Sequence, residues 1–484
     1  MDIKCTEQEL TVLHRIATAA WELEIDCYLI GGFVRDKILG RETKDIDIVC
    51  IGDGILLAHR VAEQFPVVPQ VNFFKNFGTA QIKLDVSSLG SASGNNYLLE
   101  IEFVGARKES YNFESRKPAV QSGTLEDDQN RRDFTINAMA ISLNKDDYGT
   151  LLDPFNGVTD LEQKIIRTPL TPSETFSDDP LRMMRAIRFA SQLNFEIESA
   201  TLEAIAENAS RIKIVSGERI ADELNKILLS KKPSIGFDLL YKTGLLKIIF
   251  PQMVALVGAE YIDGKGHKDN FYHTLQVVDN IAENTQDLWL RWAAVLHDIA
   301  KPATKKFEEG HGWTFHGHEV LGGRMVPKIF TQLKLPQNEK MKFVRKMVEM
   351  HLRPISLTKE NITDAAIRRL IFDAGEDLEA LMTLCRADIT SKNKQKVVRF
   401  LENFEMVLER CAEVEEKDHI RNWQPPITGE MIMETFNLPP SRMVGDLKNA
   451  IREAILDGNI SNEYEAAHSF MMAKAAELGL IKEN

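Results

Sequence analysis

Cysteine is scarce in this chain of 484 residues, which contains five scattered cysteines and no C-x-x-C spacing. An odd number of cysteines without such spacing argues against a disulfide framework and predicts a reducing compartment. The N-terminus lacks the basic and apolar segments of a signal peptide, and no apolar run approaches the length that spans a membrane. We therefore expect a soluble, cytoplasmic protein that does not bind a membrane.

Internal repeats and linkers rich in Gly, Ser or Pro are also absent. The domains are therefore expected to pack closely. A chain of this length would form about three domains. The stretch 28–52 lacks both the G-x-G-x-x-G turn of dinucleotide-binding folds and the GK[ST] of a P-loop, so neither of these phosphate sites is expected.

Residues 27–40 nevertheless indicate an anion site of a different kind. A short apolar run at 27–30 predicts a buried strand that enters a tight turn at Gly31 and Gly32. Apolar residues then recur at helical spacing, so the glycine pair would lie at a helix N-terminus, where unpaired N–H groups favour an anion. Arg35 would add a charge-assisted contact to phosphate.

Residues 44–50 alternate between apolar and polar, which predicts a strand with Asp45 and Asp47 on the same face. Adjacent carboxylates repel each other, and among several ways to relieve this repulsion the chemically active one is a shared pair of Mg²⁺ ions. An isolated Asp-x-Asp is more often a solvated strand end or loop. Its combination with a glycine turn at this spacing makes the catalytic interpretation more specific.

A third carboxylate would complete such a site. Residues 97–104 alternate in the same way and place Glu100 and Glu102 together, on the face opposite to the apolar side chains of that segment. We take Glu102 as the candidate third carboxylate and Glu100 as the reserve.

These motifs resemble the head-domain signature of class II tRNA nucleotidyltransferases and bacterial poly(A) polymerases. Similar segments follow in the order of that family at 131–140, 153–161 and 176–189. The resemblance implies that Arg132 and Asp133 contact the ribose and triphosphate. It also implies that the second segment is the hinge between head and neck, and that the third is the neck helix that reads the incoming base.

The segment 176–189 also predicts a helix from its own pattern, with an apolar stripe on one face and charged residues every three positions on another. Asp179 and Arg182 would then be neighbours that offer an acceptor and a fork of donors to the Watson–Crick edge of cytosine or adenine. Arg185 and Arg188 continue this face. The alternative is an ordinary ion pair within the helix and a solvated basic face, and the head motifs favour the first interpretation.

Residues 216–229 predict the next helix, with Ser216 as a candidate N-cap. They resemble the following neck motif of the family, in which Glu218, Arg219 and Glu223 match, and we assign these residues a positioning role. The alternative is a helix held by its apolar face, with the charged side chains in solvent.

Histidines and aspartates form a second ordered pattern downstream, consisting of His273, His297, Asp298, His318, His351 and Asp388. They resemble the ligands of an HD metal-dependent phosphohydrolase domain. A lone histidine on an apolar helix is more often a satisfied core residue, but the adjacent pair at 297–298 leaves two polar groups in need of partners. Imidazoles and carboxylates suit Mn, Fe, Co, Ni or Zn, and a bound water would attack a phosphate ester.

The net charge of −13 argues against a generally basic RNA-binding surface. Either the positive charge is concentrated along a groove, or RNA is not the substrate. We favour RNA because the head motifs are specific and a tRNA acceptor stem needs few phosphate contacts. The sequence contains two basic clusters: Arg131, Arg132, Arg182, Arg185 and Arg188 near the head, and Lys392, Lys394, Lys396 and Arg399 in the body. Solvated helix faces would explain the second cluster equally well.

The predicted fold is α+β. A small nucleotidyltransferase head at 1–155, with a mixed or antiparallel β-sheet and helices, would precede an all-α neck at 156–262, an HD-like body at 263–395 and a helical tail at 396–484. In the family that the chain resembles, the second domain is absent, degenerate or hydrolytic toward 2′,3′-cyclic phosphates and 2′-phosphates. Its activity in this chain is therefore a hypothesis.

The resemblance implies that the chain adds CCA to the 3′ end of tRNA from CTP and ATP, without a nucleic-acid template. Asp45 and Asp47 would hold two Mg²⁺ ions with help from Glu102. Two alternatives stay open. One is a poly(A) polymerase or an enzyme limited to C or A, and the other is an HD-type phosphohydrolase whose head only binds a nucleotide.

Overall fold

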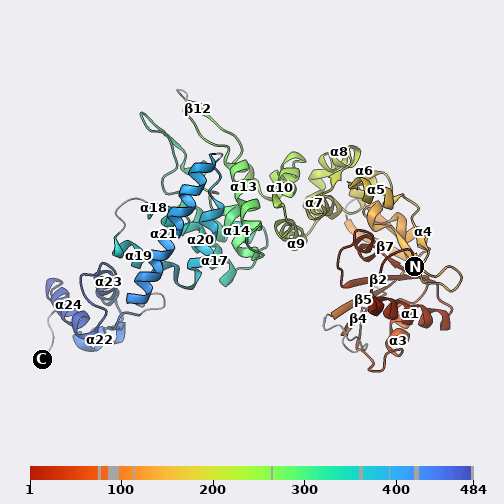
Figure 1. Ribbon diagram of the computed structural model, residues 1–484, viewed down its shortest axis with the longest axis horizontal. Coiled ribbons are helices and arrows are strands. Elements are labelled where there is room, and N and C mark those ends of the chain that lie inside the picture. The colour runs from red at the N-terminus through yellow and green to blue at the C-terminus, as the bar shows by residue number, and fades with distance from the viewer. Residues whose placement is uncertain are drawn as a thin grey trace. The chain divides into compact units, whose positions relative to one another are not determined.

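The computed structural model divides the chain into two compact units, Met1–Pro251 and Gln252–Asn484 (Figure 1). For 109–112, 115–120 and 417–418 only the backbone is described. Three predicted features lie outside the described residues: the strand start at Tyr97, the body start at 263, and Lys392 of the basic cluster. The described residues are 1–74, 78–85, 98–112, 115–262, 265–358, 363–391, 393–418 and 424–480.

A mixed sheet organises the first unit, as predicted for the head. Its strand order is β3-β4-β5-β2-β1-β8-β9. Strands β2 and β5 run parallel, whereas the other neighbours pair antiparallel. The strands are β1 (Cys27–Ile30), β2 (Asp45–Cys50), β3 (Val71–Phe74), β4 (Thr79–Asp85), β5 (Leu98–Gly105), β8 (Ala140–Ser142) and β9 (Leu151–Leu152).

Helices cover one face of this sheet. Helix α3 (Gly54–Ala62) packs against β4 and β5, and α1 (Glu7–Glu22) packs against α3 (Figure 1). A capping box in which Thr6 and Glu9 exchange hydrogen bonds begins α1. The alternating apolar side chains of β2 and β5 are buried. The carboxylates of these two strands therefore leave from the opposite face.

The helices that follow the head also belong to the first unit, and α7 packs against α9 and α10. The predicted hinge segment begins α5: Asp153 accepts hydrogen bonds from the N–H groups of Gly157 and Val158 at 2.6 and 3.0 Å. Further helices of this unit are α4 (Leu125–Asn130), α5 (Gly157–Gln163), α6 (Pro172–Asp178), α7 (Leu181–Leu193), α8 (Ser199–Asn208), α9 (Gly217–Leu228), α10 (Pro233–Lys242) and α11 (Leu245–Ile249). Its two-stranded pairs are β6 (Arg107–Asn112) with β7 (Ser115–Ser122) and β10 (Ile165–Ile166) with β11 (Glu196–Ile197). Helix α12 (Pro251–Val254) begins at the last residue of this unit and continues into the second.

The prediction of one continuous helix over 176–189 is wrong. Helix α6 ends at Asp178, α7 begins at Leu181, and Asp179 between them is extended, with φ −134° and ψ 97°. The cause is Pro180, because a proline ring disfavours the helical conformation of the residue that precedes it. Asp179 and Arg182 are therefore not neighbours on one helix.

Within its described residues, the second unit is helical apart from two short two-stranded sheets, which confirms the α+β fold. Its core contains Arg291, which is fully buried and donates hydrogen bonds to the carbonyl oxygens of Ala282 and Thr285. In the described residues, no helix has the length and apolarity to cross a membrane. The two-stranded sheets are β12 (Tyr261–Ile262) with β13 (Lys265–Gly266) and β14 (Lys306–Glu308) with β15 (Gly312–Thr314). The helices are α13 (Asn270–Ala282), α14 (Leu288–Leu296), α15 (Lys301–Thr304), α16 (His318–Gln332), α17 (Glu339–Met350), α18 (Arg353–Ser356), α19 (Asp364–Ala374), α20 (Leu378–Ala387), α21 (Lys394–Asp418), α22 (Gly429–Phe436), α23 (Arg442–Leu456) and α24 (Tyr464–Glu477).

Candidate active site and metal centre

The turn between β1 and α2 (Gly32–Ile38) has the geometry that the glycine pair predicts. Gly31 precedes α2 with φ 80° and ψ −135°, a conformation that glycine adopts readily and other residues do not. A Cβ atom at this position would lie 3.0 Å from Arg132 Nη1 and 3.3 Å from Asp47 Oδ2. The turn therefore brings backbone, a guanidinium and a carboxylate into contact.

The substitution Gly31→Ala is expected to reduce nucleotide incorporation by about 100-fold or more, because a small displacement of reacting groups costs that much. The added methyl group would displace Arg132 and Asp47, and the backbone would lose its favourable conformation. Primer extension with purified protein measures the effect. Gly40→Ala is the matched control, since Gly40 also has a positive φ of 67° but a Cβ there meets nothing within 4 Å. Equal activity of the two variants would contradict the importance of this contact.

Strands β2 and β5 place the candidate carboxylates side by side. Their parallel pairing sets Asp47 opposite Glu102 and Asp45 opposite Glu100. Burial raises the pKa of Asp47, and the charge of Asp45 adds to this effect although Arg132 opposes it. Burial, followed by the Asp47 carboxylate, raises the pKa of Glu102. A divalent cation would relieve this concentration of negative charge.

The reserve candidate Glu100 lies in a different environment. Its Oε1 atom pairs with Lys83 Nζ at 2.7 Å. Glu102 instead lines a cavity of about 740 Å³ together with Asp45 and Asp47, and Glu100 is not among the residues of that cavity. The geometry therefore favours Glu102 over Glu100 as the third carboxylate.

Hydrogen bonds connect several of the predicted nucleotide-binding residues that line the cavity. Arg35 Nη1 donates to Asn137 Oδ1 at 2.7 Å, and Asn137 Nδ2 donates to Asp133 Oδ1 at 2.9 Å. Arg185 Nε donates to Asp133 Oδ2 at 2.7 Å. Burial alone would raise the pKa of Asp133, but Arg185 and Asn137 outweigh it and lower this pKa to about 2. Asp133 thus holds Arg185 in place. Asn137 is also part of the network; it lies in the motif segment 131–140, but the motif by itself assigned it no role.

A buried aspartate that the motif search missed orients the arginine pair. Asp128 is 0% exposed, and its Oδ2 atom accepts from Arg132 Nε and Nη2 at 3.1 and 2.9 Å. Its Oδ1 atom pairs with Arg131. The signal was present in the sequence, because an acidic residue one helical turn before two arginines predicts such pairs.

The predicted base-reading residues line the same cavity as the carboxylates, despite the break at Pro180. Arg182 is 9% exposed, and its Nη2 atom donates to the carbonyl oxygen of Arg131 at 2.5 Å. Asp179 Oδ1 accepts a hydrogen bond from the N–H of Leu181 at 3.2 Å. Both side chains are therefore fixed by contacts with the protein backbone.

Helix α9, which carries the second neck motif, holds Arg188 of α7 in place. Arg188 Nε lies 2.6 Å from Glu223 Oε2, and both side chains are largely buried. A solvated position for Glu223 is therefore wrong. Of the other two matched residues, Arg219 lines the cavity and Glu218 does not. Ser216 occupies the N-cap position of α9 as predicted, but its side chain makes no capping hydrogen bond.

Positive charge is concentrated at the cavity although the whole chain is acidic. In the body, Lys394, Lys396 and Arg399 are exposed on α21, as solvated helix faces would be. Arg107 and Lys226 were not predicted, because single basic residues carry no pattern. The basic residues that line the cavity are Arg35, Arg107, Arg131, Arg132, Arg182, Arg185, Arg188, Arg219 and Lys226.

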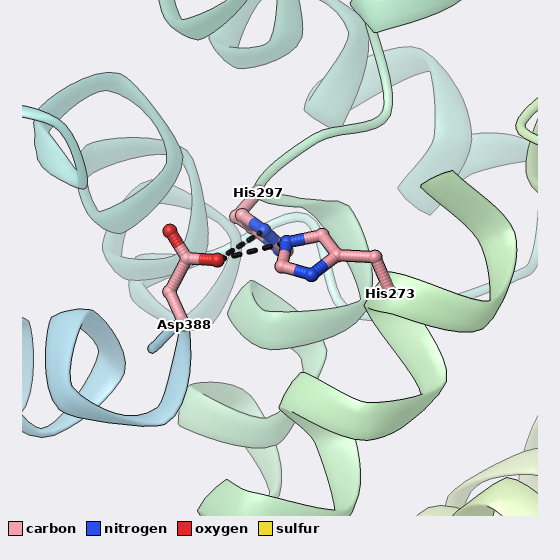
Figure 2. Close-up of side chains that lie close together, drawn as sticks. All are labelled: His273, His297 and Asp388. Carbon is pink, nitrogen blue, oxygen red and sulfur yellow. Dashed lines mark ion pairs between the residues drawn. The ribbon is translucent and has the colours of Figure 1, made fainter. Parts of the chain in front are cut away.

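The six predicted HD ligands converge in the second unit. Figure 2 shows the carboxylate of Asp388, which follows α20, facing His273 from α13 and His297 at the end of α14. Asp388 Oδ1 lies 2.9 Å from His273 Nε2 and 3.4 Å from His297 Nε2. A second group of three potential ligands is formed by Asp298, His318 and His351.

The hydrogen bonds of the three buried histidines leave one nitrogen of each ring for another partner. The Nδ1 atoms of His297, His318 and His351 lie 2.7–2.8 Å from backbone carbonyl oxygens, which fixes the proton on Nδ1. Their Nε2 atoms are buried without a hydrogen-bond partner among the residues described. Burial lowers the pKa of His351 to about 4, so this ring is neutral at pH 7. Against the effect of burial, the carboxylates of Asp298 and Asp388 raise the pKa of His297 to about 10, and a metal ion between these groups would displace that proton.

Asp298 lies between these histidines. Its Oδ2 atom is 3.2 Å from His297 Nε2, and its Oδ1 atom is 3.2 Å from His318 Nε2. Lys301 was not predicted, but its Nζ atom lies 2.6 Å from Asp298 Oδ2. The separation of three residues is the spacing of neighbours on a helix, so the pair could have been inferred from the sequence.

Three family models match successive segments of the chain. A poly A polymerase head domain matches 27–167, a probable RNA- and SrmB-binding site of polymerase A matches 194–256, and an HD domain matches 270–392. An A-adding tRNA nucleotidyltransferase from Deinococcus radiodurans is 31% identical over 354 residues, which cover 71% of this chain and 78% of the relative. A multifunctional CCA protein from Pseudomonas fluorescens is 32% identical over 323 residues, which cover 64% and 71%, respectively.

Solved structures share the fold over nearly the whole chain. The match to the CCA-adding enzyme of Bacillus stearothermophilus in complex with CTP has a TM-score of 0.65 at 23% identity, and it covers 98% of this chain and 99% of the chain of that enzyme. The match to the CCA-adding enzyme of Thermotoga maritima complexed with tRNA has a TM-score of 0.59 at 21% identity, and it covers 97% of this chain and 96% of the chain of that enzyme. The resemblance seen in the sequence is thus confirmed, and the chain belongs to the tRNA nucleotidyltransferase family with a poly(A) polymerase head domain, followed by an HD domain.

Proposed function

We propose that the protein adds CCA to the 3′ end of tRNA, using CTP and ATP and no nucleic-acid template. The observation that carries this proposal is one cavity that joins three carboxylates on β2 and β5 to the Gly31 turn and to the arginines of α7. A triphosphate is strongly negative, and the cavity supplies guanidinium groups on one side and a cation site on the other.

The three carboxylates fit divalent metal ions because burial and mutual repulsion already raise the pKa of Asp47 and of Glu102. Asp45 and Asp47 would hold two Mg²⁺ ions, and Glu102 would assist with the first. When bound, Mg²⁺ lowers the pKa of the primer's 3′-hydroxyl and stabilises the charge of the leaving pyrophosphate.

The remaining residues of the cavity bind and orient the reactants. N–H groups of the Gly31-Gly32 turn face phosphate oxygens, and Arg132, oriented by Asp128, neutralises the triphosphate. Asp133 keeps Arg185 directed into the cavity. In this position the 3′-oxygen forms a bond to the α-phosphorus while the bond from that phosphorus to pyrophosphate breaks.

We assign base selection to Asp179 and Arg182, and Arg182→Ala is the test. A hydrogen bond to a charged group contributes about 1.5–3 kcal/mol, so kcat/KM for CTP and for ATP is expected to fall by roughly 10- to 100-fold. The discrimination between CTP and UTP should fall with it. Single-nucleotide incorporation measures both quantities, with Lys213→Ala as the control because Lys213 is exposed outside the cavity. Unchanged discrimination in Arg182→Ala would remove this residue from base selection.

Addition of A alone is the second candidate, because the relative from Deinococcus radiodurans is an A-adding enzyme. Such an enzyme extends a tRNA that already ends in CC and does not use CTP. Incorporation of C into a transcript that lacks all three terminal nucleotides separates the two candidates.

We propose in addition that the HD centre holds two divalent ions of the Mn, Fe, Co, Ni or Zn type and hydrolyses phosphate esters. The division of its ligands into two groups, and the buried Nε2 atoms that have no hydrogen-bond partner in the described chain, support this proposal. When bound, such ions activate water toward phosphorus. Asp298 would contact both ions, and Lys301 beside it would bind a phosphate oxygen.

We also keep the division into head (1–155), neck (156–262), HD-like body (263–395) and tail (396–484) as a proposal. The matched segments 27–167, 194–256 and 270–392 support its first three parts. A cytoplasmic location is supported by the five cysteines, all of which are free.

A further inference from the structure

A cavity of about 190 Å³ adjoins the HD centre and is used by none of the functions proposed above. It lies within the second unit, between the loop that follows α20, helix α18 and helix α21. Figure 1 shows α21 beside α20 and α18, and both contact it. Asp388 belongs to the wall of the cavity as well as to the HD centre. A group bound in the cavity would therefore lie next to the HD ligands.

The polar side of the cavity is tied to the same histidine that faces Asp388. Thr390 lines the cavity, and its Oγ1 atom lies 2.9 Å from His273 Nδ1. His273 Nε2 lies 2.9 Å from Asp388 Oδ1. Thr390 thus fixes the ring that is directed at the HD centre, and Asp388 is common to the cavity and the centre.

Lys268 supplies a positive charge to the wall of this cavity. Its side chain is exposed, lines the cavity, and forms no ion pair with any residue in the described part of the chain. Its carbonyl oxygen lies 2.8 Å from His267 Nδ1. The His267 ring contacts Trp313 and Phe315 edge to face, at centroid distances of 5.3 and 5.7 Å. The backbone at Lys268 is therefore anchored while its ammonium group can reach an anion.

Apolar and aromatic residues also line the cavity. Phe404 is 1% exposed and packs into the core, whereas Phe400, one helical turn before it on α21, is 41% exposed. Ile355 and Ile389 line the same cavity. An exposed phenyl ring in a wall that also contains aliphatic side chains offers a surface on which a planar aromatic group stacks.

We propose that this cavity binds the organic part of the phosphate ester that the HD centre cleaves, and that it selects esters with a planar aromatic group. This inference rests on the hydrolytic function proposed for the HD centre. The phosphate lies toward Asp388, with Lys268 as its counter-charge, and the aromatic group stacks on Phe400. Phe400 is thus a specificity-determining residue, and Lys268 contributes to the binding of every phosphate ester.

The test measures binding to the full-length protein loaded with Mn²⁺, with phenylphosphonate and methylphosphonate as probes that cannot be hydrolysed. Phe400→Ala is expected to weaken the binding of phenylphosphonate about tenfold, as the loss of one aromatic stacking contact does, and to leave that of methylphosphonate nearly unchanged. Lys268→Ala should weaken both by a similar factor. Phe400→Tyr should restore the affinity for phenylphosphonate.

Leu401→Ala is the matched control, because Leu401 is 38% exposed on the same helix and does not line the cavity. The head can also bind either probe, but it does so equally in Phe400→Ala and Leu401→Ala. The difference in affinity between these two variants therefore reports binding in the cavity alone. Equal affinities of these two variants for phenylphosphonate would overturn the inference, even if the protein hydrolyses esters. A different result is also informative: phenylphosphonate binding depends on Phe400, but the protein fails to hydrolyse phenyl phosphate whichever metal is added. That result would refute the hydrolase proposal and keep the cavity as a binding site for aromatic phosphates.

Discussion

Replacing Asp45 and Asp47 together with asparagine is expected to reduce nucleotide incorporation by at least about a thousandfold, because metal-ion stabilisation of the transition state contributes several kcal/mol. Asparagine keeps the size of the side chain but removes the charge that would hold Mg²⁺. Primer extension on a tRNA lacking CCA, at saturating Mg²⁺, measures the loss. Full incorporation by the double variant would refute the assignment of these carboxylates.

The same variant separates catalysis from folding. Folding raises the pKa of Asp47 above the value that this carboxyl has in the unfolded chain. At every pH above that unfolded-state pKa, the ionised Asp47 therefore lowers the free energy of unfolding. Removing this charge should leave the melting temperature at pH 7 unchanged or higher, and the advantage should shrink as the pH falls and the wild-type carboxyl becomes protonated.

Glu100→Gln is the matched control on β5, and its activity should remain within about twofold of the wild type because Lys83 occupies that carboxylate.

Asp298→Asn is expected to abolish phosphate-ester hydrolysis by the HD centre, with a loss of at least about a thousandfold. Asp298 lies near His297 and His318, so its loss would affect both proposed metal positions. Incorporation of nucleotides should stay within about twofold of the wild type, because the carboxylates that serve it lie in the first unit. Hydrolysis of 2′,3′-cyclic nucleotides with added Mn²⁺ or Ni²⁺, together with the bound metal per chain, measures the effect.

A control for this variant is Asp373→Asn, since Asp373 is an exposed aspartate of the same unit that pairs with Arg353. It should keep both hydrolysis and bound metal. A wild-type protein that hydrolyses no ester with any metal would rule out the hydrolase proposal. Full hydrolysis by Asp298→Asn would instead show that the ligands were assigned wrongly.

The local parts of the head could be predicted from the sequence. Alternation over 44–50 and 97–104 places Asp45, Asp47 and Glu102 on one face because the period of a strand is two residues. The parallel pairing that sets Asp47 beside Glu102 joins residues that lie 55 positions apart in the sequence. No local pattern specifies that register, and only the folded sheet decides between Glu102 and Glu100.

The errors and omissions have different physical causes. The helix over 176–189 was predicted from its charge period, and the effect of Pro180 on the preceding residue was overlooked although the sequence contained it. Asn137 could not be predicted, because it joins Arg35 to Asp133 through hydrogen bonds that depend on tertiary packing. Phe400 could not be predicted either, because its place in the cavity that Asp388 also lines depends on the packing of α21 against α20.

The most direct test of the account is the length of the product formed on a tRNA transcript that lacks its terminal CCA. The purified protein is incubated with this transcript, Mg²⁺, CTP and ATP, and the products are resolved on a denaturing gel. We predict that the transcript gains C, C and A and that extension stops there, with two additions when CTP is given alone. A long ladder with ATP alone, or no use of CTP on any transcript, would contradict CCA addition.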